Sequence, residues 1–238
     1  MSQELKDKVA EKESALESPK VIVEKLTNIE QYIEHHSKKL GMIAGGIALV
    51  IAGFFGYRYW VGSQEEEAQS QIFAAVYYYE ADSLKKALNG DGNNPGFLSI
   101  SDDYGMTKAG RLAHFYAGSI YLKQGKFQDA IDNLKEFSSD DILIGPRANC
   151  LLGDAYVELN DLENGLQYYK KAALHAPNKF FSPKYLMKAG LVQELKKDYS
   201  DAIGTYDQVI QKYYDSQEAV DAKKFKARLE QMQANPGK

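Results

Sequence analysis

The chain has 238 residues, of which 44% are hydrophobic, and its formal net charge is −4. This length supports one globular domain of about 170 residues beside a separate apolar segment. The slightly acidic balance and the absence of a basic stripe argue against a nucleic-acid-binding protein. The single cysteine, Cys150, excludes an internal disulfide. Few β-branched runs and regularly spaced Ala and Gly favour helices over sheet.

The N-terminal part divides into two segments of different composition. Mixed charges and few large apolar residues predict a disordered cytoplasmic head over residues 1–20. An apolar residue then recurs every three or four positions, which predicts an amphipathic juxtamembrane helix over 21–39. The residues of this apolar face are Ile22, Leu26, Ile29 and Ile33. The pattern leaves open whether this helix is a simple lead-in or a docking element.

The next segment, Leu40–Tyr57, contains eighteen residues without a charge. A helix of that length spans roughly 27 Å, close to the thickness of a bilayer's hydrocarbon core. We therefore predict a single transmembrane helix over 40–62. The preceding charged segment is too long for the first region of a signal peptide, and no small-residue cleavage site follows the apolar run. We accordingly expect an uncleaved anchor in the lipid bilayer.

Flanking charges predict the orientation of this helix. Lys38 and Lys39 precede the apolar run, whereas Arg58 is the only basic residue close to its other end. Positive charge favours the cytoplasmic side, so the N-terminus is expected in the cytoplasm and the C-terminal domain outside it. Tyr59 and Trp60 belong to an aromatic cluster at the far end, where such rings favour the headgroup level. For a Gram-negative bacterium this means the inner membrane and the periplasm.

Small residues recur every four positions within the predicted span, at Ala44, Ala48, Ala52 and Gly56. Small side chains let a second helix approach closely, so this face is a candidate for docking the membrane helix of a partner. Gly and Ala are also common in membrane helices generally, and the sequence does not separate the two interpretations.

The C-terminal part contains an internal repeat centred on Gly118, Gly153 and Gly190, which are 35 and 37 residues apart. A period in this range is typical of a solenoid. The surrounding residues resemble the tetratricopeptide repeat, in which a small residue and an aromatic residue on the first helix precede a turn and a small residue on the second. The matching residues are Ala117, Tyr121, Gly125 and Ala130, then Tyr156, Asn160, Tyr169 and Ala172, then Ala189, Tyr199, Ala202 and Tyr206.

The predicted fold is therefore all-α, with one N-terminal transmembrane helix followed by a solenoid that resembles tetratricopeptide repeats. The repeats are expected at about 108–140, 145–177 and 182–213, before a closing helix at 216–232 whose inward residues are Ala219, Ala222, Phe225 and Leu229. The preceding segment, 63–107, should contain a helix over Gln69–Leu88 and an irregular loop over Asn89–Thr107. Phe97 and Leu98 of that loop are expected to pack on the first repeat.

No constellation typical of an enzyme appears in the sequence. The chain has no phosphate-binding loop, no paired catalytic carboxylates and no metal-ligand spacing, and the loop rich in Asp and Asn does not match a calcium-binding pattern. Cys150 lies in a repeat helix, where a small semi-buried residue is expected. We predict no catalytic, cofactor or metal site and no small-molecule substrate.

The concave face of the solenoid is the predicted partner-binding surface, because in this repeat family the first helix of each pair lines that face. The corresponding residues are Phe115, Ser119, Leu122, Cys150, Asp154, Val157, Met187, Leu191 and Glu194. They include no Lys or Asn, so the clamp with which some family members hold a peptide carboxylate is absent. An apolar groove of this kind suits either an extended peptide or the chain's own closing helix.

The whole layout, over residues 20–232, resembles the YfgM-like family of bacterial inner-membrane proteins. That resemblance implies an ancillary subunit of the SecYEG translocon, paired with a membrane-anchored periplasmic chaperone or prolyl isomerase of the PpiD type. The alternative function is a general scaffold of the cell envelope that assembles another membrane complex. An enzyme whose site escaped notice is a third and weaker interpretation.

Overall fold

The computed structural model describes residues 19–235, and side chains from His35 onward. The expected disordered head lies almost entirely outside the described residues, and so do the side chains of the apolar face at Ile22–Ile33. Every regular element of the described part is an α-helix. The chain divides into two compact units, Met1–Trp60 and Val61–Lys238.

The first unit consists, in its described part, of the helix α2, which covers Pro19–Glu80 and continues into the second unit. The predicted juxtamembrane and transmembrane segments therefore form one uninterrupted helix. No glycine in the apolar run is a helix break, because each lies in a regular α-helical stretch.

In the second unit α2 ends at Glu80. The predicted single helix over Gln69–Leu88 is therefore wrong in its last part, which contains a turn and the start of a second helix. Asp82 adopts a left-handed conformation with φ 53°, and the Ser83 amide donates to the carbonyl of Tyr78. Asp tolerates this conformation better than most residues and commonly reverses a chain there. The short helix α3, Leu84–Asn89, then carries Leu88 into the core.

The predicted loop over Asn89–Thr107 is wrong in its second half, where helix α4 covers Phe97–Tyr104. The helix forms because Phe97 and Ile100, one turn apart, are both fully buried. The ring of Phe97 stacks on Tyr116 with centroids 4.8 Å apart, which confirms the expected packing on the first repeat. The Gly, Asn and Pro residues of 90–96 keep the segment before α4 irregular, and Gly105 caps the helix at its other end.

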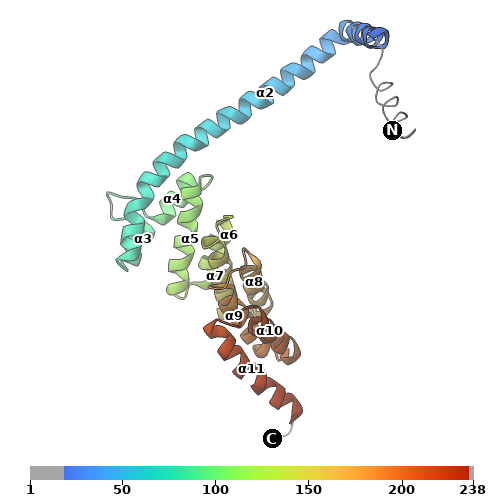
Figure 1. Cartoon of the computed structure of the whole chain (residues 1–238). Coiled ribbons are helices and arrows are strands. Elements are labelled where there is room, and N and C mark those ends of the chain that lie inside the picture. The colour runs from blue at the N-terminus through green and yellow to red at the C-terminus, as the bar shows by residue number, and fades with distance from the viewer. Residues whose placement is uncertain (1–18, 236–238) are drawn as a thin grey trace, which may run out of the picture. The chain divides into compact units, whose positions relative to one another are not determined.

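Three helix pairs follow one another through the second unit in Figure 1. The first helix of each pair is α5, α7 or α9, and the second is α6, α8 or α10. Their bounds are Lys108–Lys123 and Phe127–Glu136, then Ile144–Glu158 and Leu162–Leu174, then Ser182–Leu195 and Tyr199–Lys212.

Each pair is joined by a turn with one left-handed residue at the same place in the repeat. These residues are Gly125, Asn160 and Lys197, with φ of 72°, 61° and 65°. Gly and Asn adopt such angles readily, whereas Lys at this position is strained. The turn geometry is therefore conserved along the stack although the residue that makes it changes.

The repeating glycines bring the two helices of each pair together. A Cβ atom on Gly118 would lie 2.6 Å from Leu134, and one on Gly153 would lie 2.6 Å from the ring of Tyr169. On Gly190 it would lie 2.5 Å from the ring of Tyr206. These distances are too short for real carbon contacts, so a side chain at any of the three positions would push its helix pair apart.

The last helix, α11, covers Gln217–Ala234 and buries Ala219, Ala222 and Leu229, as the sequence predicted. Phe225 packs partly against the same core. The helix packs on α9 and α10, where the first helix of a further repeat would lie. It therefore extends the stack at its end, so the closing helix does not lie along α5 and α7.

Candidate interaction surfaces

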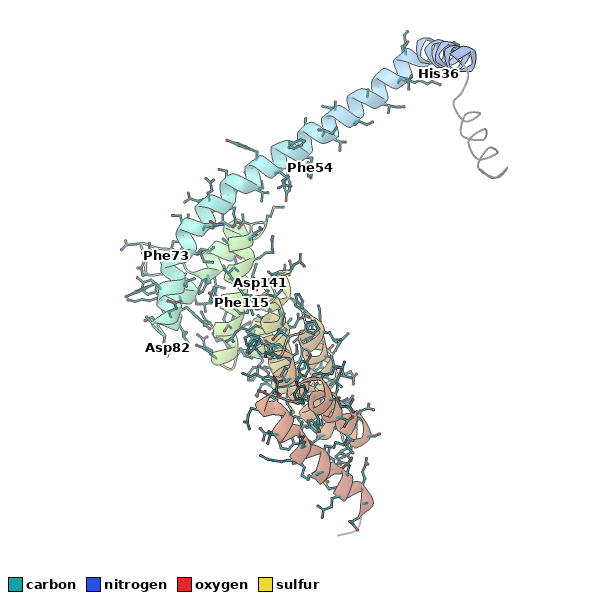
Figure 2. All side chains as sticks on the ribbon, in the orientation of Figure 1. His36, Phe54, Phe73, Asp82, Phe115 and Asp141 are labelled. Atoms are coloured by element: carbon teal, nitrogen blue, oxygen red, sulfur yellow. The ribbon has the colours of Figure 1, made fainter. Side chains whose placement is uncertain are left out.

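The apolar part of α2 exposes its large side chains throughout. The helix is long and apolar enough to cross a membrane, and no residue in its most apolar window is buried by another part of the described chain. Phe54, labelled in Figure 2, is 55% exposed, whereas Phe115 in the repeats is 6% exposed. The other exposed side chains are Met42, Ile43, Ile47, Leu49, Val50, Ile51, Phe55, Tyr57, Tyr59 and Trp60. Exposure on this scale marks an interaction surface.

The strip of small residues at Ala44, Ala48, Ala52 and Gly56 is exposed along its length. A Cβ atom built on Gly56 would meet no other atom within 4 Å. The strip is thus sterically open. Whether a partner helix occupies it stays a prediction.

The nine residues predicted for the concave face differ in how much surface they offer. Four are buried within the helix stack and present almost nothing to a partner: Phe115, Ser119, Cys150 and Met187. Leu191 is 42% exposed. The remaining four, Leu122, Asp154, Val157 and Glu194, are half-buried. Alignment to the repeat pattern identifies the helix face, but the close packing of neighbouring helices decides which side chains stay accessible.

Asp154 is the centre of a polar cluster on α7. Its Oδ1 accepts hydrogen bonds from the Tyr169 hydroxyl and from Lys188 Nζ, each at 2.5 Å. Burial, followed by this bond to Asp154, raises the pKa of the Tyr169 hydroxyl well above its usual value. The carboxylate is thus hydrogen-bonded by a tyrosine of its own repeat, and its charge is neutralised by a lysine of the next.

Glu194 on α9 makes similar contacts, although it lies four residues after the repeating glycine and Asp154 only one. Its Oε1 accepts a hydrogen bond of 2.6 Å from the Tyr206 hydroxyl, and its Oε2 pairs with Arg228 of α11. Burial and this hydrogen bond likewise raise the pKa of Tyr206. An acid contacted by a tyrosine and a cation, as at Asp154, therefore occurs again one repeat later. The cation again comes from the next helix of the concave face, here α11.

Ser119 lies at the position in α5 that matches Asp154 in α7, one residue after the repeating glycine. Its hydroxyl shares a hydrogen bond of 3.0 Å with the hydroxyl of Tyr79, from the end of α2. A side-chain hydrogen bond thus also joins α5 to the end of α2, the helix before it in the stack. Gln193 stands where the first two repeats have Tyr121 and Tyr156. It is buried, and its Oε1 accepts a hydrogen bond of 2.7 Å from the hydroxyl of Thr205.

A groove of about 620 Å³ lies between the first two repeats. It brings together three of the predicted residues, Leu122, Asp154 and Val157, and adds Phe127 and Lys188. Sequence reasoning missed Lys188 and Arg228, although a signal was present. Each lies 34 residues after the acid that it neutralises, which is close to one repeat period.

The described residues include no group of three or more His, Cys, Asp or Glu side chains arranged to hold a metal ion. Cys150 is buried, and this burial raises the pKa of its thiol to about 12. His114 lies on the first repeat with its Nδ1 3.3 Å from Asn133. These side chains are explained by packing and local hydrogen bonds.

A model of the tetratricopeptide repeat matches the chain twice, over residues 115–183 and over 150–216. The two matches together run from α5 to the end of the third pair, so the chain contains tetratricopeptide repeats. A search of the curated proteins found no match to the chain. Repeats of this type mediate protein–protein interaction.

Proposed function

We propose that this chain is a non-enzymatic membrane-anchored interaction protein. The observation that carries the proposal is an apolar helix that no other described part of the chain covers, followed by a set of tetratricopeptide repeats. In water, the exposed side chains between Met42 and Trp60 would be unfavourable by roughly 25 cal/mol per Å² of apolar surface. A bilayer removes this cost, because its interior is as apolar as the side chains.

The proposed orientation places the N-terminus in the cytoplasm and the repeats in the periplasm. It rests on Lys38 and Lys39 on one side of the run and the single Arg58 on the other. Trp60 supports an interface at the outer end, and its ring lies 6.3 Å from that of Tyr57.

The finer proposal, which comes from the resemblance to the YfgM-like family, is an ancillary subunit of the SecYEG translocon. Its partner would be a membrane-anchored periplasmic chaperone or prolyl isomerase of the PpiD type. The mechanism is tethering: an anchored repeat domain is held at high effective concentration near the exit site, so weak contacts with partners or emerging chains suffice. The strip around Ala48 and Ala52 would dock the membrane helix of a partner.

Purification of the tagged full chain from native membranes in mild detergent, with mass spectrometry of the associated proteins, tests this proposal. Near-stoichiometric SecY and a periplasmic isomerase are the expected result. Enrichment of other envelope proteins without SecY would support the alternative of a general envelope scaffold. A chain recovered from the soluble fraction would overturn the anchored interaction protein itself.

The docking strip is tested separately with Ala48→Ile, alone and combined with Ala52→Ile. Both substitutions fill the open strip, and we expect at least a fivefold loss of the co-purified membrane partner. Gly46→Ile is the matched control, because Gly46 lies two residues away and thus about 200° around the helix. Unchanged co-purification of the double variant would remove the docking strip from the proposal while leaving the anchor intact.

A further inference from the structure

The start of helix α5 is bonded to the part of α2 that comes soon after the apolar run. The backbone N–H groups of Lys108 and Ala109 donate to Oε2 of Glu65, at 2.6 and 3.3 Å. Glu65 follows Trp60 by five residues. Five residues span at most about 18 Å even when fully extended, so chain length alone keeps the start of α5 near the outer end of the predicted membrane span.

Helices α2 and α5 run in the same direction along their contact. Tyr79, later in α2 than Glu65, bonds to Ser119, and Asp82 pairs with Lys123 at the last residue of α5. The start of α5 is therefore the end of the first helix pair that lies beside the earlier part of α2. The turn that follows α5 lies at the far end.

The connection between α6 and α7, residues 137–143, lies at the same end of the first pair as the start of α5. A cavity of about 590 Å³ is bounded by Lys108 and Arg111 on the side of α5 and by the connection on the other side. Asp141 of the connection and Asp82 of the far end are both labelled in Figure 2.

This connection exposes two neighbouring large apolar side chains. Ile142 is 62% exposed and Leu143 is 53% exposed. Met106, just before α5, is exposed as well. The turn at the other end of the first pair, residues 124–126, consists of Gln, Gly and Lys. The exposed apolar side chains in the loops of this pair are thus concentrated at the end that Glu65 holds near the membrane span.

The backbone around Ile142 and Leu143 is already hydrogen-bonded. Oδ1 of Asp141 accepts hydrogen bonds of 2.8 Å from the N–H groups of Leu143 and Ile144. The carbonyl of Asp141 accepts a further bond from Gly145. An apolar environment penalises unpaired backbone groups, so these bonds let the two side chains enter the edge of a bilayer at little polar cost.

The charged side chains that line the cavity are balanced. Lys108 and Arg111 come from α5, and Asp140 and Asp141 come from the connection. Two basic and two acidic groups produce no net attraction to an anionic surface. Contact with a bilayer at this end would therefore depend on apolar side chains and not on the charge of the lipid.

We propose that Ile142 and Leu143 contact the surface of the bilayer and give the repeat domain a second attachment beside its anchor. The inference rests on the proposed function, because it requires α2 to span the membrane. The anchor holds the domain at high effective concentration at the membrane, so a contact too weak to bind a free domain suffices. The contact would restrain the orientation of the first repeat relative to the membrane.

The test uses the full chain, one molecule per lipid nanodisc, with Cys150→Ala and a single introduced cysteine that carries the environment-sensitive fluorophore NBD. The label at Ile142→Cys should be quenched by nitroxide groups on the lipid headgroups at least threefold more strongly than the label at Gln128→Cys. Gln128 is the matched control, because it is exposed near the start of α6, at the far end of the same pair. Equal quenching at the two positions would overturn the inference.

A second variant keeps the label and removes the apolar side chains. With NBD at Ser138→Cys, the combined substitutions Ile142→Ser and Leu143→Ser should lower quenching by the lipid at least threefold. Phe73→Ser removes an exposed apolar side chain of α2 instead, and it should leave quenching unchanged. All three replaced side chains are exposed, so the core stays intact. Unchanged quenching in the double variant would overturn the contact.

Lipid composition tests the apolar basis of the contact. Quenching at position 142 should differ less than twofold between nanodiscs of phosphatidylcholine and nanodiscs that also contain phosphatidylglycerol, because the charges at this end are balanced. Quenching that requires phosphatidylglycerol would overturn an apolar contact. A blue-shifted emission that nitroxide lipids do not quench would assign the surface to protein and likewise overturn it.

A third label position separates failure of this inference from failure of the proposed function. Val50→Cys lies in the apolar run, and its label should be quenched by nitroxide groups on the acyl chains. Quenching at position 50 without quenching at 142 would reject the second attachment and leave the anchor standing. Absence of quenching at both positions would count against the membrane anchor itself.

Discussion

The Tyr169 hydroxyl donates a hydrogen bond of 2.5 Å to Asp154, and its ring lies against the backbone of Gly153. One side chain thus fills the gap that the glycine leaves between two helices and donates a hydrogen bond to the acid that follows it. Tyr206 does the same with Gly190, and its hydroxyl reaches Glu194. The core and the concave surface of the last two repeats are therefore coupled through two tyrosines.

These tyrosines make stability sensitive to alkaline pH. Burial and the bonds to acids raise the pKa of both hydroxyls above the unfolded value of about 10. Above that pH the unfolded chain loses these protons while the folded chain keeps them, so the free energy of unfolding falls as pH rises. The stabilisation is fully present below pH 10.

The variant with both Tyr169→Phe and Tyr206→Phe should be less stable than the unmodified chain at pH 8, by about 1 kcal/mol for each hydrogen bond removed. The free energy of unfolding of this variant should decline less between pH 9.5 and pH 11, because the two hydroxyls that lose protons more readily in the unfolded chain have been removed. Urea unfolding of the full chain in detergent, followed by circular dichroism, measures both effects. Equal declines in the free energy of unfolding of the variant and the unmodified chain would show that other groups cause the loss of stability at alkaline pH.

Gly153→Ala should destabilise the second repeat. Its methyl group would overlap the Tyr169 ring, and overpacking of a tight contact costs about 1–3 kcal/mol. Gly204→Ala is the control, because Gly204 lies in α10 with nothing within 4 Å of an added Cβ atom. It should stabilise the chain by roughly 0.5–1 kcal/mol through helix propensity. Opposite signs in urea unfolding are expected, and equal signs would contradict the close-approach argument.

Lys197→Gly should stabilise the third repeat, although glycine usually weakens folded structure. Lys197 has φ 65°, and this left-handed conformation costs a non-glycine residue roughly 1–2 kcal/mol. After the greater flexibility of glycine in the unfolded chain is subtracted, a gain of about 0.5–1 kcal/mol remains. Lys170→Gly, in the middle of α8, should lower the free energy of unfolding by about 1 kcal/mol, because glycine is a poor helix former. Destabilisation by both substitutions would show that the turn at Lys197 is unstrained.

Cys150 should resist alkylation in the folded chain. Its side chain is buried, and a pKa raised to about 12 leaves almost no thiolate at pH 8. Iodoacetamide should therefore modify Cys150 at least a hundredfold more slowly in native than in urea-unfolded protein, as measured by mass spectrometry. A Gln128→Cys variant supplies an exposed reference thiol, and comparable native rates for the two cysteines would show that Cys150 is accessible.

The repeats and the apolar helix were predictable because their signals are local and periodic. Glycines at 35 and 37 residue intervals identify the helix pairs, and an uncharged run from Leu40 identifies the helix that can span a bilayer. The helix α4 escaped prediction, because eight residues after a segment rich in Gly and Asn carry too little periodicity. Its existence depends on Phe97 meeting Tyr116, a contact between residues distant in the sequence.

The sequence alone determined the all-α class and the apolar face of each helix, because these follow from 3.6 residues per turn. It also determined the number of repeats, through the 35- and 37-residue spacing of Gly118, Gly153 and Gly190. Only the tertiary structure decided which concave residues stay accessible. Lys188 and Arg228 neutralise Asp154 and Glu194 from the next first helix along the stack. The physical reason is that charge pairing and groove formation depend on the spacing between neighbouring helices, which packing sets and no single helix encodes.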